Sequence, residues 1–395
     1  MKIKIIALSF TEKAFYILWT LFSVGYFLLH ETEMYYMYDT GKYLGVIVNL
    51  TIISLLLVLF LQNKFSKKTF ISYALFLLVV TLIEFSIKNQ IFLVYILFIM
   101  VAQFVDFEKF VRYDLKLKTV LFFLVIFLCL IGFLDNYTAL SDSQMKQSLG
   151  FTHPNKFCCF AFTILMEWIY VRFEKIKLPE WILIAASCLI IKRIGASRTM
   201  FYVFVLVFGL FILAKMKQEI FYNRIVHFIF VIITPLMAFL SFATTYLYAQ
   251  GNSHMLALDE LMTHRLLFQA RFLEKYDINL FGQNIELVGT RGANLLGSER
   301  AILDNAYIKC ALMYGAVFFI MLCAMYSILM HQFLKRRRAD LALFALFFVL
   351  YAFGESYVLS VLYNVTLLCF LGIEQMGLKQ GTEKSKKRIK IRIKI

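Results

Sequence analysis

Long apolar runs alternate with short charged segments along almost the whole chain. The runs begin near Ala14, Tyr43, Phe70, Ile91, Leu117, Phe157, Trp181, Thr199, Ile225, Asp304, Leu341 and Tyr357. An apolar run of roughly 20 residues is long enough to cross a bilayer as a helix. The pattern therefore predicts an all-α polytopic membrane protein of about 12 transmembrane helices, folded as a single integral membrane domain over residues 1–395.

Some of these runs are less regular than the others. Those at 91–105 and 181–191 are short for a membrane-spanning helix. The last two runs are separated only by Gly354, Glu355 and Ser356, which predicts either a tight hairpin or one broken helix. Glu355 is then an outward-facing acidic group, and the simpler interpretation is a solvated turn residue.

Composition and charge agree with a membrane location. The chain is 61% hydrophobic, whereas soluble proteins are about 45–50% apolar. The formal net charge is +16, but most of the 41 Lys and Arg residues lie in segments that alternate topology places on one side of the membrane. The positive-inside rule makes that side cytoplasmic and places both termini there. Membrane lipids explain this charge better than nucleic acid, so we expect no nucleic-acid partner.

The motif inventory excludes several classes of enzyme. All seven cysteines lie in or beside apolar runs, and no CxxC occurs, so neither a disulfide framework nor a zinc site is expected. The chain has no GxxxxGK[ST], no HExxH and no GxSxG. We therefore predict no metal site and no cofactor.

Basic residues on the expected outer side break the charge rule and suggest a phosphate site. Arg193 and Arg198 flank a short outer loop, while Arg265 and Arg291 lie in a large outer loop at 249–303. Guanidinium groups bind phosphate oxygens bidentately and stabilise a departing pyrophosphate. Arg198 is the first candidate, followed by Arg265, Arg193 and Arg291. The alternative is that the run near Trp181 is re-entrant.

Two further segments have a distinct character. Within the loop at 249–303, residues 254–273 are compatible with an amphipathic helix in the membrane interface. This helix either closes a site over a lipid-linked substrate or covers the bundle structurally. The basic segment 379–395 is expected to be a cytoplasmic tail that lies on anionic lipid.

Three motifs in order resemble one family. Gly150-Phe-Thr-His153-Pro-Asn155 precedes one span, Gly195-Ala-Ser-Arg198-Thr opens another, and Leu303-Asp304-Asn-Ala-Tyr307 follows the large loop. In this order and topology they resemble the O-antigen ligase and polysaccharide polymerase superfamily, in particular Wzy-type polymerases of bacterial capsular or exopolysaccharide. The likeness covers the chain from about residue 150 onward, and the first five runs match only in hydropathy.

The resemblance implies a bundle like the metal-independent GT-C membrane glycosyltransferases. It implies a bacterial plasma-membrane enzyme that joins undecaprenyl-pyrophosphate-linked oligosaccharides at the outer face, with a flippase and a chain-length regulator as possible partners. In the reaction, an acceptor hydroxyl attacks the anomeric carbon of the donor and pyrophosphate leaves. Ligase relatives carry a histidine, regarded as the base, where this chain has Asp304. A carboxylate is a weak base at neutral pH unless burial raises its pKa.

The candidate site residues follow from the motifs and the outer charges. Asp304, Arg198 and Arg265 are the catalytic candidates, with Asp304 activating or positioning the acceptor. The substrate-binding candidates are Arg193, Arg291, His153, Asn155, Asn305 and Tyr307. His153 is also an alternative base, and the segment from His153 to Asn155 has a structural alternative, because proline suits the first turn of a helix.

Other functions stay open. Glu31-Thr-Glu33 could bind a divalent cation in a metal-dependent glycosyltransferase that uses a polyprenyl-monophosphate sugar. A flippase or transporter for lipid-linked sugars would also suit a basic outer cavity, although the large loop has no counterpart in the first half of the chain. An O-antigen ligase-type transfer is the third alternative.

Overall fold

A computed structural model describes residues 2–38, 40–61, 67–141, 144–297 and 299–371. The expected tail at 379–395 lies outside these residues. The longer helices are α1 (Lys2–Tyr26), α3 (Gly41–Leu61), α4 (Lys67–Ile87), α5 (Gln90–Ala102), α6 (Phe107–Leu130), α7 (Pro154–Arg172), α8 (Leu178–Gly195), α9 (Arg198–Met216), α10 (Arg224–Ala249), α12 (Arg265–Lys275), α15 (Gly315–Lys335) and α16 (Ala339–Tyr351). The shorter elements are α2 (Met34–Met37), α11 (Ser253–Leu261), α13 (Thr290–Leu296), α14 (Ala306–Lys309), the strands β1 (Thr138–Ser141) and β2 (Gln144–Gln147), and the 3₁₀-helix η2 (Gln218–Tyr222).

The helical membrane architecture agrees with the apolar pattern. Five helical stretches in the described residues are long and apolar enough to cross a membrane: Phe10–Glu31, Gly41–Leu59, Arg198–Met216, Arg224–Ala249 and Ala306–Lys335. Shorter apolar helices occur at Tyr73–Ile87, Gln90–Ala102 and Ala339–Tyr351. The expected total of about 12 spans is therefore not confirmed. The two strands pair as a small antiparallel hairpin between α6 and α7.

The last apolar run forms no continuous helix. In place of the continuous helix that the apolar pattern predicts, it contains two short 3₁₀-helices, η4 (Ser356–Leu359) and η5 (Val365–Cys369). Irregular backbone at membrane depth must be enclosed by protein that satisfies its polar groups. Asn364 does this: its amide donates to the Val358 carbonyl at 2.9 Å and its oxygen accepts from the Thr366 N–H at 3.2 Å. The residues from 361 to 369 are all buried.

A buried charge cluster joins α6 to α7 and α1. The Lys118 ammonium lies 2.6 Å from Asp114 and 2.5 Å from Glu167, and all three side chains are fully buried. The indole of Trp19 donates to Asp114 at 2.7 Å. One ammonium thus holds two carboxylates in the core, and an indole N–H supplies a further hydrogen bond.

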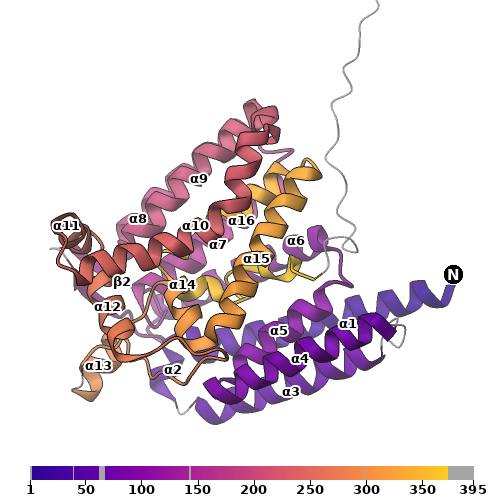
Figure 1. Cartoon of the computed structure of the whole chain (residues 1–395), viewed down its shortest axis with the longest axis horizontal. Coiled ribbons are helices and arrows are strands. Elements are labelled where there is room, and N and C mark those ends of the chain that lie inside the picture. The colour runs from indigo at the N-terminus through magenta and orange to yellow at the C-terminus, as the bar shows by residue number, and fades with distance from the viewer. Residues whose placement is uncertain (1, 39, 62–66, 142–143, 298, 372–395) are drawn as a thin grey trace, which may run out of the picture.

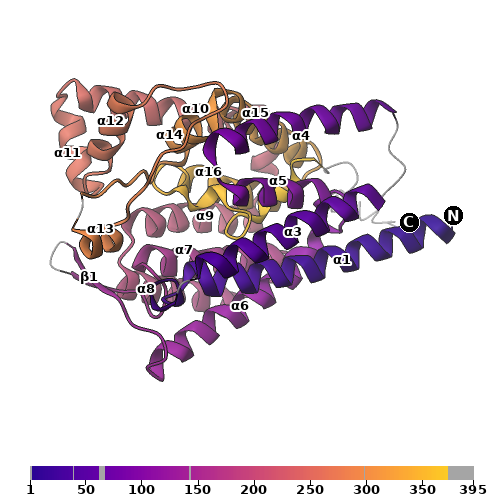
Figure 2. The same ribbon diagram turned by 90° about the horizontal axis from the view of Figure 1, so that it is seen from below.

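The two ends of the bundle differ. Figure 1 and Figure 2 both place α11, α12 and α13 at one end and the start of α1 at the other. We call the first the loop end. Between α15 and α16, the Arg338 guanidinium binds Asp340 at 2.8 Å and Glu108 at 2.7 Å. Two π-helical turns, η1 (Phe27–Glu31) and η3 (Cys310–Tyr314), follow α1 and α14. Such turns are frequent at functional sites.

Candidate functional site

Four polar side chains from distant parts of the chain meet at the loop end. Arg265 Nη2 lies 2.5 Å from Glu355 Oε1, and Arg265 Nη1 lies 3.6 Å from Asp304 Oδ2. Asn155 donates its side-chain amide to the same Glu355 oxygen at 3.0 Å. We call Arg265, Asp304, Glu355 and Asn155 the Arg265 cluster. It contains Asn155 from the first motif, Asp304 from the third motif and Arg265 from the large loop.

The second motif also packs against the Arg265 cluster. Gly354 has no side chain, and a Cβ atom placed on it would lie 2.4 Å from Thr199 Cγ2 and 3.5 Å from Arg265 Nη1. The start of α9 therefore packs against the turn that carries Glu355. Arg198 precedes Thr199 and is exposed, and Arg193 is exposed on the last turn of α8.

Local capping explains how Arg265 is presented. Arg265 is the first residue of α12, which follows a sharp turn with Thr263 and His264 at positive φ. The Asp259 carboxylate accepts the N–H groups of Leu266 and Leu267 at 2.7 and 3.2 Å. These bonds satisfy donors at a helix start, where a carboxylate is also electrostatically favourable.

The segment at 254–273 is therefore more structured than a single surface helix. It divides into α11 and α12 at the turn of residues 262–264. The buried Gln269 on α12 accepts from Thr245 of α10 at 2.8 Å, and Leu266 and Phe272 are buried beside it. This packing fixes α12 against the bundle and so fixes Arg265.

Burial gives Glu355 an unusual acidity. Its side chain is 1% exposed. Desolvation raises the pKa of Glu355 to about 7, since it exceeds the opposing effect of Arg265, and Asp304 adds repulsion. The pKa of the Arg265 guanidinium is raised by the same two carboxylates despite its own burial. A carboxyl group that titrates near neutral pH is suited to proton transfer.

Two atoms of the Arg265 cluster lack a hydrogen bond within the described structure. They are Glu355 Oε2 and Arg265 Nη1, and both are buried. Buried polar atoms are normally paired, so unpaired ones at one place indicate a position for a ligand or water. Lys309 adds a further cation nearby: its ammonium donates to Ser356 at 3.1 Å and is close enough to interact electrostatically with Asp304.

Two predicted sugar contacts have internal partners instead. Asn305 is fully buried and caps α14 by accepting from the N–H groups of Tyr307 and Ile308. Its amide donates to Ser241 at 2.9 Å. The Tyr307 hydroxyl donates to the Val349 carbonyl at 2.8 Å. These side chains hold the start of α14, and with it Asp304, in place.

His153 also has a structural task. It is the N-cap of α7, and its Nδ1 accepts the backbone N–H of Asn155 at 3.1 Å. Proline at the first helical position completes this start, as the structural alternative in the sequence analysis expects. Burial, followed by the charges of Lys156, Lys146 and Arg265, lowers the pKa of His153 to about 4.

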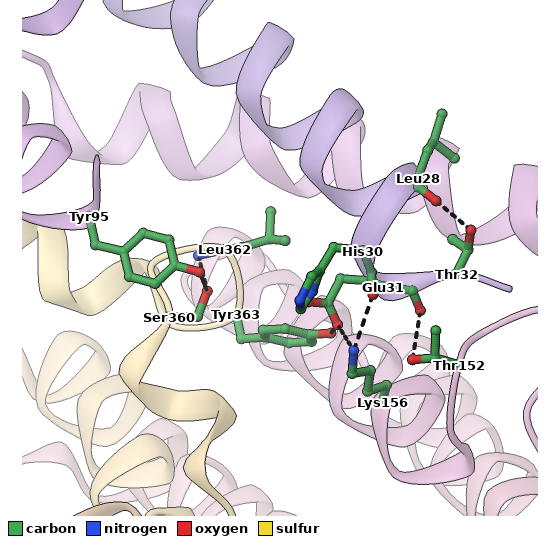
Figure 3. Close-up of polar contacts among 10 residues, drawn as sticks. All are labelled: Leu28, His30, Glu31, Thr32, Tyr95, Thr152, Lys156, Ser360, Leu362 and Tyr363. Carbon is green, nitrogen blue, oxygen red and sulfur yellow. Dashed lines mark hydrogen bonds and ion pairs between the residues drawn. The ribbon is translucent and has the colours of Figure 1, made fainter. Parts of the chain in front are cut away.

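A second cluster lies beside the first and is formed by Glu31 (Figure 3). Glu31 accepts from Lys156 at 3.0 Å, from the Tyr363 hydroxyl at 2.7 Å and pairs with His30 Nδ1 at 2.9 Å. We call these four residues the Glu31 cluster. The Thr152 N–H donates to the Glu31 carbonyl at 3.0 Å, so the first motif is joined to the end of η1.

Glu33 and Arg291 form a third contact. Glu33 is buried and forms an ion pair with Arg291, whose guanidinium lies 4.2 Å from the Tyr36 ring and 4.9 Å from the Tyr137 ring. Burial raises the pKa of Glu33 although Arg291 opposes the shift. Arg291 is thus engaged by a carboxylate and two aromatic rings.

The acidic pair Glu31 and Glu33 has two different cationic partners, Lys156 and Arg291. Among the described residues, no group of three His, Cys, Asp or Glu side chains is placed to hold a metal ion. The sequence interpretation of Glu31-Thr-Glu33 as a cation-binding pair gains no geometric support from these contacts.

The sequence pattern indicates Glu355 as an outward-facing acidic group, but neither Glu355 nor Lys156 is among the predicted site residues. The interpretation of Glu355 as a solvated turn residue is wrong, because tertiary packing buries it between Asn155 and Arg265. Lys156 was not singled out, although it directly follows the motif that ends at Asn155. In each case the sequence feature that could have indicated the residue is a single charged residue at the edge of an apolar run.

Comparisons with known proteins add no identification. No protein-family model matches the chain, and neither the curated proteins nor the solved structures give a significant match. The resemblance to the O-antigen ligase and polymerase superfamily stays a prediction.

Proposed function

We propose that this protein is a membrane-embedded glycosyltransferase that polymerises oligosaccharide units linked to a polyprenyl diphosphate. The proposal is carried by one observation: three motifs that are far apart in sequence converge on the Arg265 cluster. Asn155 represents the first motif, Thr199 the second and Asp304 the third. Short motifs whose residues lie together in the structure support a shared functional site more strongly than the order of the motifs in the sequence does.

The site also has a suitable position in the bundle. It lies at the loop end, whereas the start of α1 lies at the opposite end (Figures 1 and 2), and alternating topology assigns the short basic loops to the side of that start. By the positive-inside rule, the loop end faces the outside of the plasma membrane. A lipid-linked substrate would enter there with its diphosphate at the membrane surface and its isoprenoid chain in the bilayer.

The charges suggest a division of roles. Arg265 is held between Asp304 and Glu355, so its charge is largely compensated and we assign it to positioning these two carboxylates. Asp304 is 26% exposed and can hydrogen-bond an acceptor sugar. The diphosphate is assigned to the exposed Arg198 and Arg193, where bidentate binding would stabilise the departing negative charge.

A reconstituted reaction tests the proposal. The full chain in liposomes is given a synthetic polyprenyl-diphosphate oligosaccharide, and products are separated by gel and mass spectrometry. Ladders of repeat units with release of polyprenyl diphosphate are expected. R265A should abolish the ladder, while R271A, which changes an exposed arginine on the same helix, should retain it.

The alternatives predict other outcomes. Transbilayer movement of the substrate without ladders would indicate a flippase. A single transfer to a foreign acceptor glycan would indicate ligase-type activity. Loss of the ladder with EDTA, restored by a divalent cation, would indicate the metal-dependent alternative. Each result would contradict metal-independent polymerisation.

A further inference from the structure

His30 is a half-exposed imidazole with a buried carboxylate behind it. It lies in the π-helical turn η1 at the end of the first apolar span. Its Nδ1 is 2.9 Å from Glu31 Oε1, and the side chains of His30 and Glu31 are 34% and 5% exposed. The ring stacks on Tyr26 at a centroid distance of 4.7 Å and meets Tyr35 edge-on at 5.5 Å. These contacts fix the plane of the imidazole.

The partners of Glu31 determine which nitrogen of His30 carries the proton. The Lys156 ammonium and the Tyr363 hydroxyl both point to Glu31 Oε2 (Figure 3), at 3.0 and 2.7 Å. An ammonium and a hydroxyl donor stabilise the ionised carboxylate, which can only accept hydrogen bonds. His30 Nδ1 must therefore donate to Oε1. The lone pair of the neutral ring is then on Nε2, on the far side of the ring from Glu31.

His153 has the opposite arrangement. Its Nδ1 accepts the Asn155 N–H, so the proton of the neutral ring is on Nε2. His153 can donate a hydrogen bond from Nε2 but has no free lone pair there. Burial and neighbouring cations also oppose its protonation. Of these two histidines at the loop end, His30 is the one arranged to accept a proton.

Two elements connect His30 to the Arg265 cluster. The first turn of α7 carries Asn155, which binds Glu355, and Lys156, which binds Glu31 and donates to the His30 carbonyl at 3.3 Å. The segment after α16 carries Glu355 at its start and Tyr363 further along. The Glu31 cluster and the Arg265 cluster are therefore built on shared backbone.

We propose that His30 is the general base that removes the proton from the acceptor sugar hydroxyl, an inference that rests on the glycosyltransferase function proposed above. The hydroxyl proton passes to His30 Nε2 while the acceptor oxygen forms a bond to the donor anomeric carbon. The bond from that carbon to the diphosphate oxygen breaks, and its electron pair leaves with the diphosphate. Glu31 stabilises the imidazolium ion, and the proton is then released to water.

H30N isolates the chemical role of His30 from its structural one. The Asn amide can still donate to Glu31, as Nδ1 does, but it has no basic nitrogen at the position of Nε2. In the liposome assay, H30N should lower the elongation rate by about 10²–10⁴-fold, the usual range for loss of a general base. H254N changes an exposed histidine of α11 at the same end and should elongate at the wild-type rate.

Ladders from H30N at the wild-type rate would overturn the assignment of His30 and leave polymerisation intact. If the wild-type protein makes no ladders at all, both proposals fail together.

A substrate-free measurement covers the case in which H30N does not fold. Diethyl pyrocarbonate acylates unprotonated, accessible imidazole nitrogens, and mass spectrometry locates the modified residues. In the wild-type protein at neutral pH, His30 should be modified readily and His153 should be protected. Protection of His30 under the conditions that modify His254 would contradict an accessible lone pair on Nε2 and overturn the proposal.

Discussion

Arg265 and Glu355 form a buried ion pair between residues 90 positions apart, with Arg265 Nη2 2.5 Å from Glu355 Oε1. This contact fastens α12 to the turn after α16. Asn155 and Asp304 complete it from two other elements. The pair therefore has two consequences that can be measured separately, one for stability and one for the acidity of Glu355.

Removal of Arg265 should destabilise the fold. R265A leaves Glu355 buried without its cation, and breaking a buried pair costs about 3–5 kcal/mol in unfolding free energy. R271A, on the exposed side of the same helix, should change stability by no more than about 0.5 kcal/mol. Thermal unfolding in detergent measures both. If R265A lowers the melting temperature more than R265A/E355Q does, the lost stability comes from the unpaired Glu355 carboxylate. Equal melting temperatures of R265A and the wild type would contradict a stabilising Arg265–Glu355 ion pair.

Glu355 should make stability depend on pH. Its folded pKa of about 7 lies above the ordinary value of 4.5, so the folded protein binds a proton that the unfolded chain releases. The stability gained from this proton is complete below pH 4.5 and is lost as the pH rises to about 7. The wild-type protein should therefore lose stability relative to E355Q between these values. Parallel melting temperatures of the two proteins over this range would show that Glu355 titrates normally.

The sequence predicts the helices far better than the contacts between polar residues. Apolar periodicity located helices because every span needs the same kind of residues. It did not reveal the broken segment after Glu355, because a buried irregular segment is as apolar as a helix and differs mainly in residues such as Asn364. Arg265 and Asp304 were found from the loop charge and the motif. The burial of Glu355 and the pairing of Glu31 with Lys156 depend on tertiary packing, which local pattern does not contain.

Lys118 should be essential to the fold although it lies far from the motifs. It is the ammonium that compensates Asp114 and Glu167 in the core. K118M should lower the unfolding free energy by about 3–5 kcal/mol, because two buried carboxylates then lack a cation. K116M alters an exposed lysine two residues earlier and should be nearly neutral. The triple variant D114N/K118M/E167Q should recover much of the loss; a triple variant as unstable as K118M would contradict this charge argument.

The close approach of two glycines should control the position of the loop before Asp304. Residues 279–283 lie across the start of α15, where the N–H of Ala316 donates to the Asn279 carbonyl at 2.9 Å. Gly282 and Gly315 both have positive φ. A Cβ at Gly282 would lie 2.0 Å from the Met313 carbonyl oxygen, and a Cβ at Gly315 would lie 2.5 Å from the Leu280 carbonyl oxygen. Both oxygens accept backbone hydrogen bonds between the loop and the chain around the start of α15, so neither can move without breaking these bonds.

G282A and G315A should each reduce the unfolding free energy by at least about 2 kcal/mol, because backbone strain adds to a clash with main-chain atoms. G289A is the matched control, since Gly289 has a φ of −67° and no neighbouring atom within 4 Å of its Cβ position. Melting temperatures in detergent should separate the two loop variants from both G289A and wild type. If G282A has the same melting temperature as G289A, residues 279–283 do not pack on α15. The argument that this loop positions Asp304 would then be wrong. If G282A is destabilised but remains folded at low temperature, its elongation rate should fall below that of G289A there, because Asp304 follows the loop and depends on it for position.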